Sequence, residues 1–133
     1  MAERVYCLYR GKDQESILMQ KNACHDFAEK KGWNIVGEEQ EIGVSGYKVS
    51  TDDLVKLKRI RKAAEQGEFD NLLVFMYDRL GRNLNETPFI AEWFTKKGIH
   101  VWSVYEGEII DGVDAERMLD YIRFWQTDEA QKL

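Results

Sequence analysis

The segment Leu72–Tyr77 (LLVFMY) is almost wholly apolar, and this feature most limits how the chain can fold. Such a run is typical of a central strand of a parallel sheet, where helices cover both faces. Parallel neighbours must be joined by crossovers, which helices usually supply. The run therefore predicts an α/β domain with a mostly parallel sheet flanked by helices.

The rest of the chain shows the expected alternation. Further strands are predicted from short apolar runs, at residues 4–9, 33–36 and 99–104. Apolar residues at helical spacing predict helices over 16–31, from Ser50 or Thr51 to Gly67, from Asn85 to Gly98 and from Asp114 onward. The inner face of the third helix is expected to carry Phe89, Ile90, Trp93 and Phe94. The domain organisation predicted for the 133 residues is a core over 1–113 and the start of a long C-terminal helix over 114–133.

Composition excludes several classes of protein. Hydrophobic residues make up 44% of the chain, which is enough to offset chain entropy and excludes disorder as the main state. The net charge of −5 argues against a surface that binds nucleic acid everywhere, although a local basic site remains compatible with it. No apolar run approaches the roughly 18 residues of a membrane helix, and no signal-peptide pattern begins the chain. Two cysteines are too few for a disulfide framework or a zinc cage, so a reduced, cytoplasmic protein is expected. No association with a membrane is expected.

Charged residues follow two of the predicted strands. Asp78, Arg79 and Arg82 come directly after the central run, and two guanidiniums three residues apart share one face of a helix. Planar cations so placed suit a phosphate. Taken alone, however, these residues favour a structural Asp–Arg pair with Arg82 solvated. Arg10 follows the first strand and is therefore expected at the same sheet edge, unless it is simply solvated there. Three clustered arginines repel one another unless an anion joins them, and a phosphodiester transition state is such an anion.

Further motifs extend this pattern along nearly the whole chain. They are Val5–Arg10 (VYCLYR), Gln20, Gly43–Gly46 (GVSG), Asp78–Arg82 (DRLGR), Trp102–Gly107 (WSVYEG) and Tyr121–Gln126 (YIRFWQ). In this order they resemble the N-terminal catalytic domain of the serine site-specific recombinases, the resolvase/invertase family. The likeness is greatest to the large serine recombinases of mobile elements. The Asp-Arg-Leu-Gly-Arg motif after an apolar strand is specific, whereas Gly-Val-Ser-Gly alone is weak.

The resemblance implies roles for particular residues. Arg10, Arg79 and Arg82 would bind the scissile phosphate, while Asp78 and Gln20 would support and order that cluster. The implied activity is DNA recombination or integration, in which a serine cuts double-stranded DNA through a phosphoseryl intermediate and the strands then rejoin. It implies no metal and no other cofactor. The implied partners are double-stranded DNA and further copies of the chain, as a dimer or an active tetramer. The family's sequence-reading DNA-binding domain is not found in these residues.

The chain departs from the family pattern at two positions. The family has a nucleophilic serine just after its first arginine, but here Arg10 runs directly into Gly11–Gln14, so the nucleophile is unknown. Residues missing after Arg10 are the favoured explanation, and an inactive relative is the alternative. Leu54 falls where the family has another arginine, and Glu41 falls where it usually has an aspartate.

The other hydroxyls and acids are given ordinary roles. Ser16 is expected to cap the first helix, and Ser45 to stabilise a turn. The acidic residues Glu106, Glu108 and Asp111 could bind a metal, but a solvated loop is favoured.

The histidines are also given ordinary roles. His25 lies beside Cys24 on a helix, where neighbouring side chains diverge, so these two residues form no metal pair. His100 is expected to pack within a strand.

The predicted C-terminal helix carries apolar residues on more than one side. One side can pack on the core, and the other needs a partner copy. The residues expected at that oligomer interface are Met118, Ile122, Phe124 and Trp125.

Two rival functions remain. One is a recombinase-like subunit that has lost its nucleophile and acts only in binding and assembly. The other is a receiver-type or flavodoxin-like signalling domain, which shares the α/β class. A receiver would need acidic residues at the strand ends, where this chain places arginines.

Overall fold

The computed structural model describes residues 2–42, 51–80 and 86–109. The elements in chain order are β1 (Arg4–Gly11), α1 (Gln14–Lys31), β2 (Asn34–Ile42), α2 (Thr51–Glu65), β3 (Asn71–Val74), the 3-10 helix η1 (Tyr77–Arg79), α3 (Glu86–Lys96), β4 (His100–Ser103) and β5 (Gly107–Ile109). The sheet order is β2-β1-β3-β4-β5, with the first four strands parallel and β5 antiparallel to β4. This confirms the predicted mostly parallel α/β fold. The predicted C-terminal helix lies outside the described residues.

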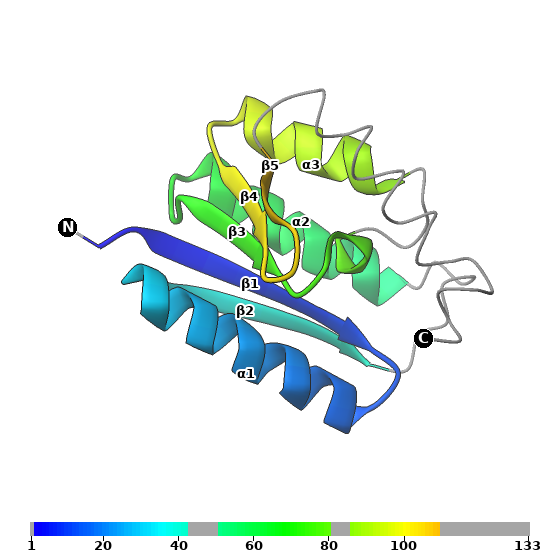
Figure 1. Cartoon of the computed structure of the whole chain (residues 1–133). Coiled ribbons are helices and arrows are strands. Elements are labelled where there is room, and N and C mark those ends of the chain that lie inside the picture. Colours follow the sequence, from blue (N-terminus) through cyan, green and yellow to red (C-terminus); the bar gives the residue numbers. More distant parts are fainter. Residues whose placement is uncertain (1, 43–50, 81–85, 110–133) are drawn as a thin grey trace.

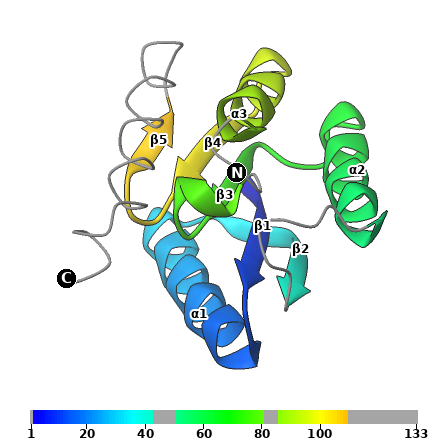
Figure 2. The same ribbon diagram turned by 90° about the vertical axis from the view of Figure 1, so that its right-hand side faces the viewer.

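Helices cover the sheet on both faces (Figure 1). Helix α1 packs on one face, where Val5, Cys7 and Tyr9 of β1 meet Ile17 and Cys24. Helices α2 and α3 cover the other face, as the turned view shows (Figure 2). The core on that side joins residues of β1, β3, α2 and α3, including Leu8, Leu72, Val74, Ile60 and Phe94.

Strand β3 is central, as predicted, but it is shorter than its apolar run. All four residues Asn71–Val74 are buried, and β3 pairs with β1 on one side and β4 on the other. The chain then leaves the sheet, so Tyr77 belongs to η1 rather than to the strand. In η1 the Tyr77 amide donates to the Glu106 carboxylate rather than to a neighbouring strand.

Helix α1 begins two residues earlier than predicted, and the prediction that Ser16 caps it is wrong. Asp13 is the N-cap, and its carboxylate accepts a hydrogen bond from the Ser16 amide at 2.8 Å. The Ser16 hydroxyl instead accepts from the Gln20 side chain at 3.3 Å. The predicted end is confirmed, because Gly32 adopts the left-handed conformation (φ 74°) that a glycine accommodates without strain.

The expected inner face of α3 needs correction. Phe89 is 72% exposed, and Ala91 takes its place on the inner face of α3 beside Ile90 and Phe94. The buried stripe of α3 is centred on residues 90, 91 and 94, and Phe89 lies to one side of it. The second strand, predicted to begin at residues 33–36, begins at Asn34 and extends to Ile42.

The acidic residues near the end of the described chain do not form a simple loop. Glu108 lies in β5, and its carboxylate is hydrogen-bonded to Nδ1 of the exposed His100 at 2.6 Å. His100 is therefore not a packing residue. Asp111 lies outside the described residues. Within the described part of the chain, no cluster of three or more metal-ligating side chains occurs, and no helix is long and apolar enough to span a membrane.

Candidate active site

Arg10 lies at the carboxyl end of β1, where parallel pairing with β2 places it opposite Glu41. Its Nε donates to Glu41 Oε2 at 3.0 Å, and the two side chains are only 17% and 4% exposed. Among the described residues, the buried Nη1 of Arg10 has no hydrogen-bond partner. A buried donor of this kind costs free energy unless something binds it. The Arg10–Glu41 pair therefore presents an oriented cationic donor at the sheet edge.

Gln20 holds the backbone of Arg10 rather than its guanidinium. The fully buried amide accepts from the Arg10 N–H at 3.1 Å and donates to the Arg10 carbonyl at 2.7 Å. One side chain of α1 thus satisfies both polar groups of the residue where β1 is about to end. The predicted role of Gln20 in ordering the arginine cluster stays a prediction.

Arg79 stands at the same edge of the sheet. Leu8 of β1 pairs with Val74 of β3 in parallel register, so both chains leave the sheet in the same direction. The 3-10 helix η1 then contacts β1, and Arg79 within it is half-buried. Asp78 is also in η1, and Arg82 lies outside the described residues. The fold thus brings Arg10, Gln20 and Glu41 into one bonded group and places η1 beside it.

The connection from β1 to α1 is very short. Gly11 still pairs with Ile42 in the sheet, and only Lys12 and Asp13 precede the helix. Gly11 is needed there because a Cβ would lie 2.5 Å from the Ser16 Oγ. Neighbouring side chains of a strand point to opposite faces, so Arg10 points away from the α1 face that Tyr9 and Ser16 occupy. Ser16 is therefore not placed beside the Arg10 guanidinium.

The α1 face beneath the site contains buried groups held in their neutral form. Burial raises the pKa of the Cys7 thiol to about 12 and also raises that of Cys24. The Tyr9 phenol donates to Glu38 at 2.6 Å, and burial raises its pKa as well. Nucleophilic cysteines need a lowered pKa, so these two thiols serve packing.

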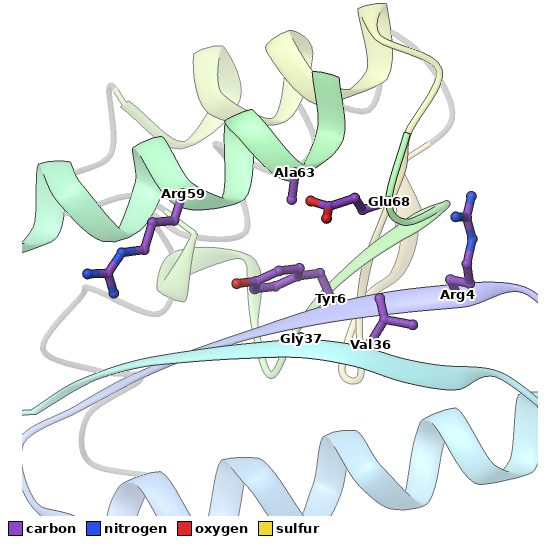
Figure 3. A pocket seen from close by; sticks show the side chains of 7 residues that line it. All are labelled: Arg4, Tyr6, Val36, Gly37, Arg59, Ala63 and Glu68. Atoms are coloured by element: carbon purple, nitrogen blue, oxygen red, sulfur yellow. The ribbon is translucent and has the colours of Figure 1, made fainter. Parts of the chain in front are cut away.

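A pocket of about 480 Å³ lies between β1, β2 and α2. Figure 3 shows that the Tyr6 ring lies across its centre, with Arg59, Ala63 and Glu68 above and Val36 in front. Its lining includes Arg4, the first residue of β1, so the pocket lies toward the end of the strand opposite Arg10. It is separate from the Arg10 group.

Sequence reasoning missed how Glu106 is used. Its carboxylate accepts from the Tyr77 amide at 3.0 Å and from the Ser103 hydroxyl at 2.7 Å. These contacts join η1 to the turn between β4 and β5. The residues around Glu106 indicate only an acidic turn. Its partner Tyr77 is 29 residues away in the sequence, so no local pattern indicates the contact.

Comparison with known proteins identifies the family. The model of the resolvase N-terminal domain matches residues 10–129. The chain belongs to the resolvase N-terminal domain family. No curated protein sequence matches it.

Solved structures support this family assignment. The N-terminal catalytic domain of TP901-1 integrase is 25% identical, with a TM-score of 0.71, over 93% of this chain and 96% of that one. The C-terminal catalytic domain of ISC1926 TnpA, an IS607-like serine recombinase, is 23% identical, with a TM-score of 0.65, over 91% and 79%. A resolvase family site-specific recombinase from Streptococcus pneumoniae is 19% identical, with a TM-score of 0.72, over 98% and 92%. The last two show the shared fold.

These findings confirm the resemblance to serine recombinases, including the large serine recombinases. The chain is a serine recombinase catalytic domain of the resolvase family. The individual roles assigned to Arg10, Gln20, Asp78, Arg79 and Arg82 remain predictions.

Proposed function

We propose that this domain cuts and rejoins double-stranded DNA through a phosphoseryl intermediate. The observation that carries the proposal is the half-buried Arg10 guanidinium, which Glu41 orients and whose buried Nη1 has no hydrogen-bond partner among the described residues. Arg10, Arg79 and Arg82 bind the scissile phosphate, and Gln20 and Asp78 order them. Such donors stabilise charge that develops in the transition state, and each contributes roughly 3–4 kcal/mol.

The covalent step exchanges one phosphodiester for another. A serine Oγ attacks phosphorus, the bond from phosphorus to the 3′ oxygen breaks, and the proton ends on that oxygen as a free 3′-hydroxyl. Attack by a 3′-hydroxyl on the phosphoseryl bond reverses the step. Because the bond energy is kept in the enzyme–DNA link, rejoining needs no ATP. The serine belongs just after Arg10, at the position that this chain leaves open.

A second candidate is a cleavage-incompetent subunit that acts only in binding and assembly. The short β1–α1 connection favours it. Gly11 fits against Ser16, and Asp13 caps α1, so the junction is complete without a nucleophile-bearing segment. Such a subunit keeps the phosphate site but depends on another recombinase for the cut.

The proposal extends to organisation and partners. Residues 1–113 form the catalytic core, and residues 114–133 begin a long helix that pairs copies of the chain and contacts DNA. Met118, Ile122, Phe124 and Trp125 form the interface of a dimer that becomes a tetramer when active. The protein acts in the cytoplasm, on DNA of a mobile element.

Adduct formation on a nicked suicide duplex tests the chemistry. The duplex carries the end sequence of the element that encodes the protein, and the covalent product is resolved on a denaturing gel in EDTA. Two proteins are compared: the chain as it stands, and a variant with Val-Ser-Thr inserted between Arg10 and Gly11. An adduct from either supports the phosphoseryl mechanism. An adduct from the insertion variant alone identifies the natural chain as the cleavage-incompetent subunit.

Arg79→Ala, made in whichever of these proteins is active, tests the phosphate site. We expect about 10²–10³-fold less adduct, because one preorganised donor is lost at the transition state. The matched control is Arg59→Ala, since Arg59 is exposed on α2 and pairs with Glu39 at 3.8 Å. Equal yield from Arg79→Ala and its parent removes Arg79 from the site. Cleavage that EDTA abolishes identifies a metal nuclease instead.

A further inference from the structure

The turn between β4 and β5 is bonded to the 3-10 helix that carries Arg79. Glu106 lies in this turn, and its Oε2 accepts from the Tyr77 amide at 3.0 Å. The Tyr77 phenol donates in return to the Gly107 carbonyl. Tyr77 is therefore held at both its backbone and the end of its side chain. Two residues later in the chain comes Arg79.

Glu106 is itself held in one orientation. The buried Ser103 hydroxyl donates to the Glu106 carboxylate at 2.7 Å and accepts from the Glu106 amide at 2.7 Å. The turn is also tied to the chain beyond β3, since the Val104 and Tyr105 amides donate to the Val74 and Phe75 carbonyls. The carboxylate thus projects from a fixed support and is not a mobile surface group.

These contacts hold the chain after it has left β3 at Val74. If the strand continued, the Tyr77 amide could bond to a neighbouring strand. Here it donates to the Glu106 carboxylate instead. The backbone turns there, the Arg79 amide donates to the Met76 carbonyl, and Tyr77 packs in the core with Leu80. Loss of the carboxylate removes the hydrogen bond that ties the Tyr77 amide to the β4–β5 turn, and the hold of that turn on η1 is then weaker.

We propose that Glu106 is a positioning residue, which aims Arg79 at the scissile phosphate by anchoring η1 through the Tyr77 amide. This assignment rests on the proposed function, because it needs Arg79 to bind phosphate. Reaction rates are sensitive to such placement, and a shift of about 1 Å can cost about 10²-fold. The acidic side chain predicted to lie in a solvated loop thereby gains a role at the site.

The hairpin itself offers a matched control. Glu108 lies two residues further along, in β5, and its carboxylate bonds to His100 at 2.6 Å rather than to η1. Glu106→Ala and Glu108→Ala remove the same charge from the same hairpin. Only the first removes the anchor of η1. Glu106→Gln keeps an acceptor oxygen for the Tyr77 amide and for Ser103, so it separates hydrogen bonding from charge.

The experiment follows the Arg79 side chain by NMR. The Nε–Hε signal of Arg79 is assigned by its loss in Arg79→Lys, and a short DNA duplex of mixed sequence is titrated at low salt. We expect the signal to shift in the wild type, in Glu108→Ala and in Glu106→Gln. In Glu106→Ala we expect at least about 10-fold weaker response, with the amide spectrum of the core unchanged. If Glu106→Ala does not fold, Glu106→Asp, whose carboxylate falls one methylene short, replaces it.

The outcomes separate the two proposals. No shift in the wild type overturns the phosphate site and hence the proposed function. A wild-type shift that Glu106→Ala or Glu106→Asp reproduces in full overturns the positioning role and leaves the phosphate site standing. An equal loss in Glu108→Ala also overturns it, because the effect then comes from the charge of the hairpin.

Discussion

Gln20 is a polar side chain buried completely beside apolar residues of α1, and its bonds to Arg10 explain why it is tolerated. Gln20→Ala leaves two backbone groups of Arg10 without partners, at about 1–3 kcal/mol for each buried group. We expect the free energy of unfolding to fall by about 2–6 kcal/mol, measured by urea denaturation. Asn22→Ala, an exposed change on the same helix, should stay within about 0.5 kcal/mol. Equal urea midpoints for Gln20→Ala and Asn22→Ala would contradict a stabilising role for the Gln20–Arg10 hydrogen bonds.

The buried Cys7 thiol and the partly buried Tyr6 phenol of β1 make the stability of the fold sensitive to high pH. Burial raises the pKa of Cys7 from 9.0 to about 12 and that of Tyr6 from 10.0 to about 12. In the unfolded chain both groups ionise at their ordinary values, so between those values and about 12 the folded chain holds more protons. The free energy of unfolding must then fall as the pH rises.

The measurement is the urea midpoint between about pH 8 and about pH 11. We expect the midpoint to fall over this range in the wild type. Cys7→Ala and Tyr6→Phe each remove one titrating group, so each should show a shallower fall, whatever its stability at neutral pH. A midpoint that stays constant in the wild type would falsify the protonation argument.

At the scale of elements, the start of α1 depends on Asp13. The carboxylate of Asp13 accepts from the Ser16 amide, so Asp13→Ala removes the N-cap of an 18-residue helix. We expect a loss of about 1 kcal/mol in the free energy of unfolding. Asp26→Ala removes an equal charge from the same helix but only an exposed pair with Lys30, and should cost about 0.3–0.5 kcal/mol.

The comparison also tests which residue caps the helix. Ser16→Ala keeps the Ser16 amide and therefore the Asp13 cap, so its cost should be clearly smaller than that of Asp13→Ala. If Ser16→Ala lowers the free energy of unfolding more than Asp13→Ala does, Asp13 is not the residue that stabilises the start of α1. Gly11 packs against Ser16, so the first turn of α1 lies directly against the end of β1.

At the scale of the whole molecule, we expect copies of the chain to associate through residues 114–133. The proposed interface residues Phe124 and Trp125 are large and apolar, and a charge at both positions cannot be desolvated without cost. Sedimentation of the 133-residue chain should show concentration-dependent association, which Phe124→Glu/Trp125→Glu abolishes. The control is Phe89→Glu, at an exposed apolar position of α3. If the wild type and the double variant sediment alike as monomers at high concentration, the interface lies elsewhere.

Much of the fold follows from local pattern. The burial of Asn71–Val74, the glycine that ends α1 and the alternation of strands with helices are all encoded in neighbouring residues. Such signals survive because helical and strand periodicities are properties of short segments. The edge position of Arg10 was predictable for the same reason, since carboxyl ends of parallel strands share one edge. The family motifs added the expected roles of the arginines and Gln20.

The remainder depended on contacts between distant segments. The bond from the Tyr77 amide to Glu106 spans 29 residues, so no local pattern indicates it. The cap of α1 is an exception, because Asp13 and Ser16 are close in the sequence and the choice between them was simply missed. The exposed position of Phe89 depends on how α3 turns against the sheet, and its residue type alone indicates the opposite. The sequence by itself determined the order of the elements and the edge where charge gathers, because these follow from periodicity and chain direction. Only the tertiary structure decided which side chains satisfy which buried polar groups, because hydrogen-bond partners are chosen by proximity in space.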